Sequence, residues 1–343
     1  MALNQRVLGS IPRRRTFASD ERRIPTRPAP ADAPPARERR APGRADGAPG
    51  RDAARTRAGH VAIVGLPNAG KSTLLNRVLG EKVSITSRRP QTTRRRVAGI
   101  LTRGDAQAVL VDTPGLLEPA YALQRALAGE IERSLEGVDL ILLVRDLRRG
   151  ADAEPGLPAR LPAPALLVLS KADLVPPGRA AATAGEARAE GRWSDVHVVS
   201  AVTGEGVYRL TDAVLERLPA GAFLYDAEQL SDRPLRFLAA ELVREALFHE
   251  LGAEVPYACH VEVTAFEEHR PVPRVEAVIH VERESQKGIV IGRAGETLRR
   301  IGTAARAGIQ ELAGGQVFLQ LRVKVRPNWR RRPADLRRFG YLT

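Results

Sequence analysis

A run of apolar residues at 60–65 leads directly into the glycine-rich sequence GLPNAGKS at 65–72. The spacing G-x-x-x-x-G-K-S is that of a phosphate-binding loop, which requires a strand before it and a helix after it. Glycines allow successive backbone N–H groups to face one concavity, and the N-terminus of the following helix adds positive potential there. We therefore expect a strand over 60–65, a helix over 71–80, and a site for the phosphates of a nucleotide between them.

The residue types inside this loop suit different tasks. The Lys71 ammonium is expected to reach the β- and γ-phosphates, and the Ser72 hydroxyl is expected to ligate Mg²⁺. Asn68 has two interpretations: its amide oxygen holds a monovalent cation such as K⁺ against the phosphates, or it stabilises the turn. The predicted nucleotide contacts in this loop are Gly65, Leu66, Pro67, Asn68, Ala69, Gly70, Lys71, Ser72 and Thr73.

Short runs rich in Val, Ile and Leu alternate with helical patterns over the part of the chain at 59–218. The runs lie at 60–65, 108–112, 140–146, 165–170 and 196–200, with helix candidates such as 71–80 and 122–136 between them. Such runs are typical of parallel strands that are covered on both faces. The alternation predicts an α/β fold, a doubly wound domain with a mostly parallel sheet.

Two short sequences at the ends of strand candidates predict which base is bound. In SKAD at 170–173, the Asp173 carboxylate can accept from the N1–H and exocyclic amine of guanine, while Lys171 packs along the base. In SAVTG at 200–204, a backbone N–H near Ala201 can serve guanine O6. Ligands of such folds bind at the carboxyl ends of the strands. The predicted guanine contacts are Ser170, Lys171, Ala172, Asp173, Ser200 and Ala201.

The sequence VDTPG at 111–115 ends another strand candidate. Asp112 can hold the Mg²⁺ shell there, and the Gly115 N–H can bond the γ-phosphate. The next residue is Leu116, which cannot orient an attacking water as a glutamine does in some GTPases, so hydrolysis should be slow or the water is placed another way. The predicted contacts in this segment are Asp112, Thr113, Pro114, Gly115 and Leu116.

The polar sequence SRRPQTTRRR at 87–96, called the switch segment below, lies between the phosphate loop and Asp112. A threonine in it would complete the Mg²⁺ sphere only when the γ-phosphate is present. We choose Thr93, with Thr92 as the alternative. The predicted metal ligands are Ser72, Thr93 and Asp112. The residues predicted to take part in catalysis are Lys71, Thr93, Gly115 and Asn68.

A linker predicted at 219–234 leads to a second, smaller domain at 235–326. An amphipathic helix pattern at 231–252 marks its start. Strand patterns follow at 258–268 and 275–283, and then come a helix pattern at 296–313 and a strand pattern at 317–325. This order predicts a mixed α+β module with three strands.

The sequence IVIGRAGETL at 289–298 carries a second glycine loop, directly after a short apolar strand signal. No Lys-Ser pair follows its glycines, so it is not a second nucleotide loop. It resembles the GXXG loop of a KH domain, which clamps single-stranded nucleic acid by its backbone. An ordinary turn at a helix start is the alternative. The predicted RNA contacts are Lys287, Gly288, Ile289, Ile291, Gly292, Arg293, Ala294, Gly295, Arg299, Arg300, Trp329 and Arg330.

The net charge of +14 is concentrated at the two ends of the chain. Residues 1–58 contain 14 Arg, 6 acids and few apolar residues, so we expect a disordered basic extension. An organelle transit peptide is the alternative, although such peptides usually carry fewer acids. Residues 320–343 contain 8 basic residues and one acid. Trp329, Phe339 and Tyr341 lie among arginines in the basic tail at 327–343, and this mixture predicts contact with RNA.

The chain contains a single cysteine, Cys259, which excludes an internal disulfide framework. We therefore expect a reducing compartment. No apolar run approaches the roughly 18 residues of a membrane-spanning helix, and the start of the chain lacks the apolar core of a secretory signal.

Taken over 59–343, the chain resembles the Era family, bacterial GTPases of small ribosomal subunit assembly. The resemblance rests on GLPNAGKSTLLN, SITSRRPQTTRRR, VDTPGL, SDRPLRFLAAELVREAL, VERESQKGIVIGRAGETLRRIGTAAR and VKVRPNWRRRPADLRRFGY. It implies a Ras-like GTPase domain followed by a type II KH domain, with Mg²⁺-dependent GTP hydrolysis. It also implies binding of the 3′ end of 16S rRNA in the 30S precursor.

The resemblance further implies a cytoplasmic protein, with peripheral association at the inner membrane face; the mitochondrial matrix is the alternative location. We expect a monomer. Ser170 stands where the family usually has Asn, so we expect weaker nucleotide binding with the guanine preference kept. Two other functions stay open: a GTPase whose second domain binds a protein, and an RNA-binding scaffold with weak turnover.

Overall fold

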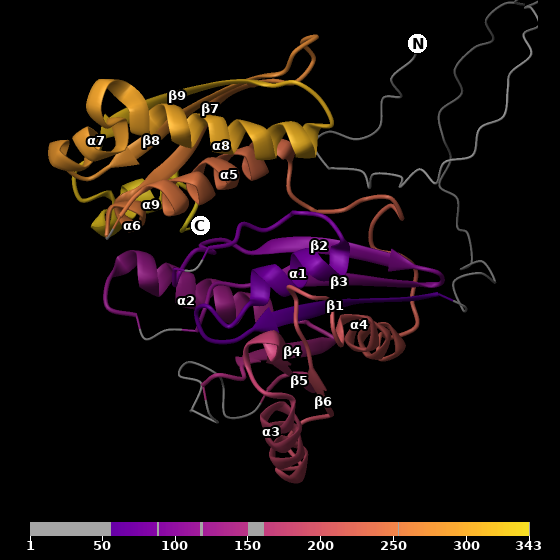
Figure 1. Cartoon of the computed structure of the whole chain (residues 1–343). Helices are drawn as coiled ribbons and strands as arrows, with labels where there is room; N and C mark the ends of the chain where they lie inside the picture. Colours follow the sequence, from indigo (N-terminus) through magenta and orange to yellow (C-terminus); the bar gives the residue numbers. More distant parts are fainter. Residues whose placement is uncertain (1–55, 88, 117–118, 150–160, 253, 343) are drawn as a thin grey trace, which may run out of the picture.

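The computed structural model describes residues 56–87, 89–116, 119–149, 161–252 and 254–342 (Figure 1). It forms an N-terminal domain, coloured indigo to pink in Figure 1, and a C-terminal domain in orange and yellow. The predicted disorder of residues 1–58 falls outside the described ranges except at its end. There the prediction is wrong by two residues, because residues 57 and 58 already belong to the first strand.

The N-terminal domain has one six-stranded sheet in the order β2-β3-β1-β4-β5-β6. Only β2 runs antiparallel to its neighbour β3, and the other strand pairs are parallel. The predicted doubly wound α/β fold is thereby confirmed, although β2 was missed. The elements are β1 (Arg57–Val64), α1 (Lys71–Leu79), β2 (Val97–Arg103), β3 (Ala106–Asp112), α2 (Ala122–Leu135), β4 (Leu140–Asp146), β5 (Ala165–Ser170), η1 (Ala172–Leu174), α3 (Pro177–Ala189), β6 (Asp195–Val198) and α4 (Val207–Glu216).

Strand β1 lies in the middle of this sheet and is buried on both faces. Val61 and Ile63 pack on the side of α1 and α4, whereas Ala62 and Val64 pack on the side of α2 and α3. This two-sided burial explains why the strand is a continuous apolar run. It also fixes the carboxyl end of β1, and therefore the start of the phosphate loop, at the centre of the sheet edge.

The C-terminal domain is a three-stranded sheet, β7-β8-β9, with helices α5, α7 and α8 packed on its apolar face. Strands β7 and β8 are antiparallel, and β8 and β9 are parallel. None of the helices in the described ranges has the length and apolar content to cross a membrane. The elements are α5 (Leu235–Glu250), α6 (Val255–Ala258), β7 (His260–Glu267), β8 (Arg274–Val281), α7 (Glu284–Ile291), η2 (Arg293–Gly295), α8 (Glu296–Ala313), β9 (Phe318–Val325), η3 (Trp329–Arg331) and α9 (Pro333–Arg338).

The strand predicted before the second glycine loop is wrong, because residues 289–291 form the last turn of helix α7. The side chain of Gln286 starts this helix by accepting the N–H groups of Glu282 at 2.9 Å and Arg283 at 3.1 Å. Only Val290 of the apolar run is buried, while Ile289 is 50% exposed. Three apolar residues are too few to distinguish a strand from a helix by pattern.

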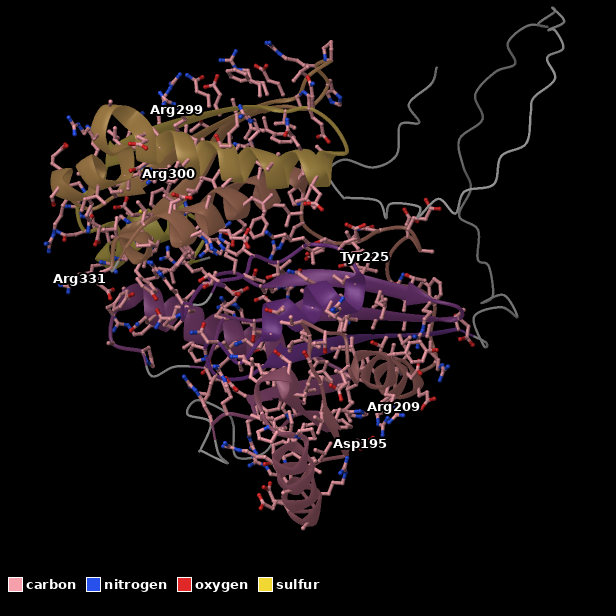
Figure 2. The ribbon with its side chains drawn as sticks, viewed as in Figure 1. Asp195, Arg209, Tyr225, Arg299, Arg300 and Arg331 are labelled. Carbon is pink, nitrogen blue, oxygen red and sulfur yellow. The ribbon has the colours of Figure 1, made fainter. Side chains whose placement is uncertain are left out.

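The predicted linker is an ordered part of the N-terminal domain. Gln107 on β3 donates to the Tyr225 carbonyl at 2.9 Å and accepts the Leu224 N–H at 2.8 Å. Ser231 donates to the Ala98 carbonyl on β2 at 2.7 Å. The helix predicted over 231–252 therefore begins only at Leu235, after Pro234. Figure 2 shows Tyr225 beside these strands.

The basic tail is also folded, and its aromatic residues are buried. Trp329 is 0% exposed, and its indole N–H donates to the Ala258 carbonyl at 2.8 Å. The Tyr341 hydroxyl lies 3.0 Å from His260 Nδ1. Together with Phe339 these rings pack against Leu123 on α2. The predicted contact of Trp329 with RNA is wrong for this arrangement, because its ring faces are covered by protein.

Candidate functional site

A cavity of about 640 Å³ opens where the parallel strands end. The sequence-predicted residues that line it are Pro67, Asn68, Gly70, Lys71, Ser72, Thr73, Thr93, Gly115, Ser170, Lys171, Asp173 and Ala201. The other predicted nucleotide contacts are not part of this lining: Gly65, Leu66, Ala69, Asp112, Thr113, Pro114, Leu116, Ala172 and Ser200. Several of these support the lining through hydrogen bonds.

The phosphate loop has the backbone that its glycines allow. Gly65 has a φ of +148° and lies so close to β4 that a Cβ would be 2.2 Å from the Val144 carbonyl oxygen. Gly70, with a φ of +98°, begins helix α1. A side chain at Gly65 would therefore clash with β4, and one at Gly70 would strain the backbone because of its positive φ. Behind the loop, the Leu116 N–H donates to the Gly65 carbonyl at 3.1 Å.

Lys71 is buried at the base of this loop. Its ammonium donates to the carbonyls of Gly65 at 3.0 Å and Leu66 at 3.1 Å. Burial lowers the pKa of Lys71 to about 8, although the nearby Asp112 opposes the shift. A bound phosphate would supply the negative charge that this ammonium lacks, so the loop is suited to an anionic ligand.

Three oxygen-bearing side chains meet beside Lys71. The Ser72 hydroxyl lies 2.6 Å from Asp112 Oδ2 and 3.0 Å from the Thr93 hydroxyl, and Thr93 lies 3.4 Å from the same Asp112 oxygen. Among the described residues, Asp112 Oδ1 is buried without a hydrogen-bond partner. Burial raises the pKa of Asp112, and Lys71 and the hydroxyls oppose that rise. Hard oxygen donors with an unused carboxylate oxygen fit Mg²⁺.

Two details of this cluster differ from the sequence reasoning. Ser84 also donates to Asp112 Oδ2, at 2.7 Å, and no motif indicated it. Of the two threonines, Thr93 is the one at the cluster. The Thr92 hydroxyl instead donates to the Arg89 carbonyl at 2.8 Å. The geometry therefore favours Thr93 over Thr92 as the switch ligand.

The predicted guanine-reading residues lie together at the ends of β5 and β6. Asp173 is exposed to the cavity, and its Oδ1 accepts from the Ser200 hydroxyl at 2.6 Å. Lys171 has a left-handed φ of 62° and donates to the Asn68 carbonyl. This hydrogen bond joins the segment at 170–173 to the phosphate loop. Asn68 itself has a φ of 62°, as expected for a turn residue.

Sequence reasoning missed the contribution of β4 to this site. Asp146, the last residue of β4, accepts from Lys171 at 2.8 Å and from Arg148 Nη2 at 2.7 Å. Burial of Asp146 favours its neutral form. The hydrogen bonds from Arg148 and Lys171 outweigh this and hold its pKa well below the usual range. Asp146 therefore fixes the lysine that is predicted to pack along the base.

The second glycine loop joins helices α7 and α8 in the C-terminal domain. Gly292 has a φ of +73°, and a Cβ there would lie 2.2 Å from the Thr297 hydroxyl oxygen. Gly295 has a φ of +79° and open space around it, and Ala294 also has a positive φ. A ligand could therefore approach the loop at the exposed Ala294 and at the open space beside the half-buried Gly295.

Of the basic side chains around this loop, two form ion pairs with described residues and two do not. Lys287 pairs with Glu284 at 3.6 Å and Arg300 with Glu250 at 2.8 Å. Arg293 and Arg299 are exposed and form no ion pair within the described part of the chain. Figure 2 shows Arg299 and Arg300 on the C-terminal domain. Of the other predicted contacts, Gly288 and Ile289 are exposed and Ile291 is half-buried, while Arg330 bonds Glu282 and Trp329 is buried.

A phosphate loop, an oxygen cluster that includes the predicted switch threonine Thr93, and the predicted guanine-reading residue Asp173 lie together on a doubly wound sheet. This arrangement defines a P-loop GTPase, here with a second α+β domain. Family models match both parts: "50S ribosome-binding GTPase" over 60–171 and "KH domain" over 254–330. The chain belongs to the Era family of GTPases, and it hydrolyses GTP. The predicted family, fold class and enzyme class are confirmed.

Curated relatives and solved structures agree on this family. The chain is 41% identical to GTPase Era of Afipia carboxidovorans over 86% of this chain and 97% of the relative. It is 43% identical to GTPase Era of Rhizobium meliloti over 83% and 93%. A variant of Aquifex aeolicus Era bound to GDP·AlF₄⁻ is 36% identical, with a TM-score of 0.80, 84% of this chain and all of that chain covered.

A second solved structure with the same identity, TM-score and coverage is Era in complex with MgGDPNP and nucleotides 1506–1542 of 16S ribosomal RNA. In that relative Mg²⁺ accompanies the bound nucleotide, as the sequence predicts for this chain.

Proposed function

We propose that this protein binds the 3′ end of 16S rRNA through its second glycine loop and assists assembly and rRNA maturation of the small (30S) ribosomal subunit. The observation that carries the proposal is the open space at Gly295 between α7 and α8, next to the exposed residues Arg293, Ala294 and Arg299. Such a loop can clamp a sugar–phosphate backbone. The complex of a relative with an rRNA fragment gives the RNA to be tested.

In the N-terminal domain, we assign Mg²⁺·GTP to the 640 Å³ cavity. Ser72, Thr93 and Asp112 would hold the metal ion, which neutralises charge on the phosphates. Lys71 binds the β- and γ-phosphates, the Gly115 N–H bonds the γ-phosphate, and Asp173 accepts from the guanine ring. Because Leu116 is buried and apolar, the attacking water is oriented by another group.

Asn68 is our candidate for the group that replaces a water-orienting side chain, and it acts by holding K⁺ against the phosphates. Its place in the cavity lining supports the proposal. A monomer, a cytoplasmic location and peripheral contact with the inner membrane stay predictions from the family resemblance, and so does the mitochondrial alternative.

The proposal is tested by filter binding with an RNA that carries the 16S 3′ end and with a scrambled RNA of the same length. We expect tighter binding of the natural sequence, and affinity for both RNAs that falls steeply with salt. A protein-binding second domain would instead show no salt-sensitive RNA affinity. Equal affinity for the two RNAs would leave RNA binding in place but contradict recognition of the 3′ end.

A further inference from the structure

Helix α5 of the C-terminal domain contacts the N-terminal domain just before the switch segment and within it. This helix lies on the side of its domain that faces the N-terminal domain (Figure 1). Before the segment, Glu245 accepts the Thr86 N–H at 2.8 Å and pairs with Lys82 at 2.5 Å. Within the segment, the Arg244 guanidinium donates to the Thr92 carbonyl. Two neighbouring residues of α5 therefore hold a segment of the other domain.

Arg244 is buried to an unusual degree for an arginine, since it is 1% exposed. Its charge is balanced by Glu241 on the same helix, with Nε 3.0 Å from Glu241 Oε1. Burying an ion pair costs solvation that the attraction between the charges often fails to recover. Within the described contacts, the hydrogen bond that this guanidinium makes outside its own domain is the one to Thr92.

The two residues that flank Thr93 in the sequence both contact the second domain. The preceding carbonyl, that of Thr92, accepts from Arg244. The following residue, Arg94, is 4% exposed and donates to the carbonyls of Cys259 and Tyr257, each at 2.8 Å. Between these anchors the Thr93 hydroxyl stands 3.0 Å from Ser72, at the oxygen cluster.

We infer that Arg244 is a positioning residue for the GTPase site: by holding the Thr92 carbonyl, it keeps the Thr93 hydroxyl at the cluster that receives Mg²⁺·GTP. The second domain thus completes the GTP-bound form of the first. Coupling between binding sites is reciprocal, so GTP also stabilises the docked position of α5. The inference rests on the proposed role of Thr93 and is independent of RNA.

The test compares the affinities of GDP and a non-hydrolysable GTP analogue for purified protein in Mg²⁺, without RNA. Arg244→Met should weaken analogue binding by at least roughly tenfold, the lower end of the effect of losing a hydrogen bond to a charged group. GDP affinity should stay within about twofold, because Thr93 is recruited only with the γ-phosphate. The matched control is Arg236→Met on the same helix, since Arg236 bonds Val263 within its own domain. It should change neither affinity.

A double mutant separates positioning from general destabilisation. In a Thr93→Ala background, Arg244→Met should weaken analogue binding by no more than about twofold further, because both changes remove the same interaction. An additive loss, or an equal loss for GDP and analogue, overturns the inference. If Thr93→Ala alone leaves analogue affinity unchanged, the role of Thr93 is wrong and the inference fails with it. If Thr93→Ala weakens binding and Arg244→Met does not, the inference alone fails.

A second variant covers the case in which Arg244→Met does not fold. Arg244→Lys keeps a positive charge beside Glu241 but has one short donor group in place of the planar fork. It should fold, as judged by circular dichroism, and should show the same selective loss of analogue affinity. Unchanged affinity for both nucleotides in a folded Arg244→Lys protein also contradicts the inference.

Discussion

The Ser170 hydroxyl donates to the carbonyl of Ala69 at 2.6 Å, which connects the end of β5 to the phosphate loop. It also lies 3.0 Å from the Arg145 carbonyl on β4. In the family pattern an asparagine at this position is expected to connect the base and the phosphate loop. The serine thus keeps the hydrogen bond to the phosphate loop. It lacks the longer amide side chain that could also reach the base.

We therefore predict that Ser170→Asn tightens GDP and GTP binding by roughly three- to tenfold, the value of one net hydrogen bond of about 0.5–1.5 kcal/mol. The preference for GTP over ATP should not change, because Asp173 remains. Asp173→Asn should instead lose guanine and favour xanthine nucleotides, since a donor then meets the second carbonyl of xanthine. Titration of a fluorescent GDP measures both. Equal or lower affinity in Ser170→Asn would contradict the first expectation.

A second prediction concerns Asp146, which no sequence motif indicated. Asp146→Asn should raise the GDP dissociation rate by roughly ten- to a hundredfold, because hydrogen bonds from Lys171 to a charged partner are worth about 1.5–3 kcal/mol. Stopped-flow displacement of a fluorescent GDP gives the rate. The control is Asp195→Asn at the opposite end of the sheet (Figure 2), where Asp195 pairs with Arg217. Similar rates in the two variants would remove Asp146 from the site.

How far the sequence predicts this molecule depends on how local each signal is. The strands of the N-terminal domain are apolar on both faces, so strands such as β4 and β5 are visible as uninterrupted apolar runs. The phosphate loop and the guanine-reading residues are also short, contiguous patterns. The strands and the phosphate loop were predicted correctly because neighbours in the sequence determine them, whereas the guanine-reading role of Asp173 stays a prediction.

Apart from the short apolar run at 289–291, errors arise where distant residues decide the structure. Trp329 lies among arginines, which suggested a nucleic-acid surface, but it is buried by Leu123 and Leu127 about two hundred residues earlier. The roles of Asp146 and Arg244 likewise depend on which strand or helix is placed beside them. An acidic residue at a strand end and an arginine in an amphipathic helix carry no local sign of those partners.

A third prediction uses the lowered pKa of Lys71. Bound phosphate stabilises the charged ammonium, so above pH 8 nucleotide binding must take up a proton. GDP affinity should therefore be about tenfold weaker at pH 9 than at pH 7. The folding stability of the unliganded protein should instead rise between pH 8 and 10.5. In that range the lysine of the unfolded chain still holds its proton, whereas the buried Lys71 has lost it. Lys71→Met should abolish the pH dependence of GDP binding; an unchanged slope in that variant assigns it to another group.

A fourth prediction concerns monovalent cations. If Asn68 holds K⁺ against the phosphates, GTP turnover should be roughly tenfold higher in KCl than in NaCl at equal ionic strength, which corresponds to about 1.4 kcal/mol in the transition state. Asn68→Gly should remove the difference, since glycine adopts the φ of 62° without strain. Equal turnover of the wild-type protein in both salts would exclude Asn68 from this role.

The last prediction tests the second glycine loop. Gly292→Asp and Gly295→Asp together should abolish RNA binding, because carboxylates there repel phosphate, and GTP hydrolysis without RNA should be nearly intact. Gly295→Asp alone is the cleaner variant: a side chain has open space at Gly295, whereas at Gly292 it would meet Thr297. We expect Gly295→Asp to weaken rRNA binding at least tenfold, which corresponds to a loss of about 1.4 kcal/mol or more in binding free energy.

The matched control for that variant is Gly314→Asp, at the far end of α8. Gly314 has a φ of +69°, close to the +79° of Gly295, and it also has open space around it. The two substitutions therefore impose the same charge and similar backbone strain on the same helix. Filter binding should show a loss for Gly295→Asp and little change for Gly314→Asp. An equal loss in both would mean that charge or strain, rather than contact at the loop, weakens RNA binding, and an unchanged affinity in both would place the RNA elsewhere.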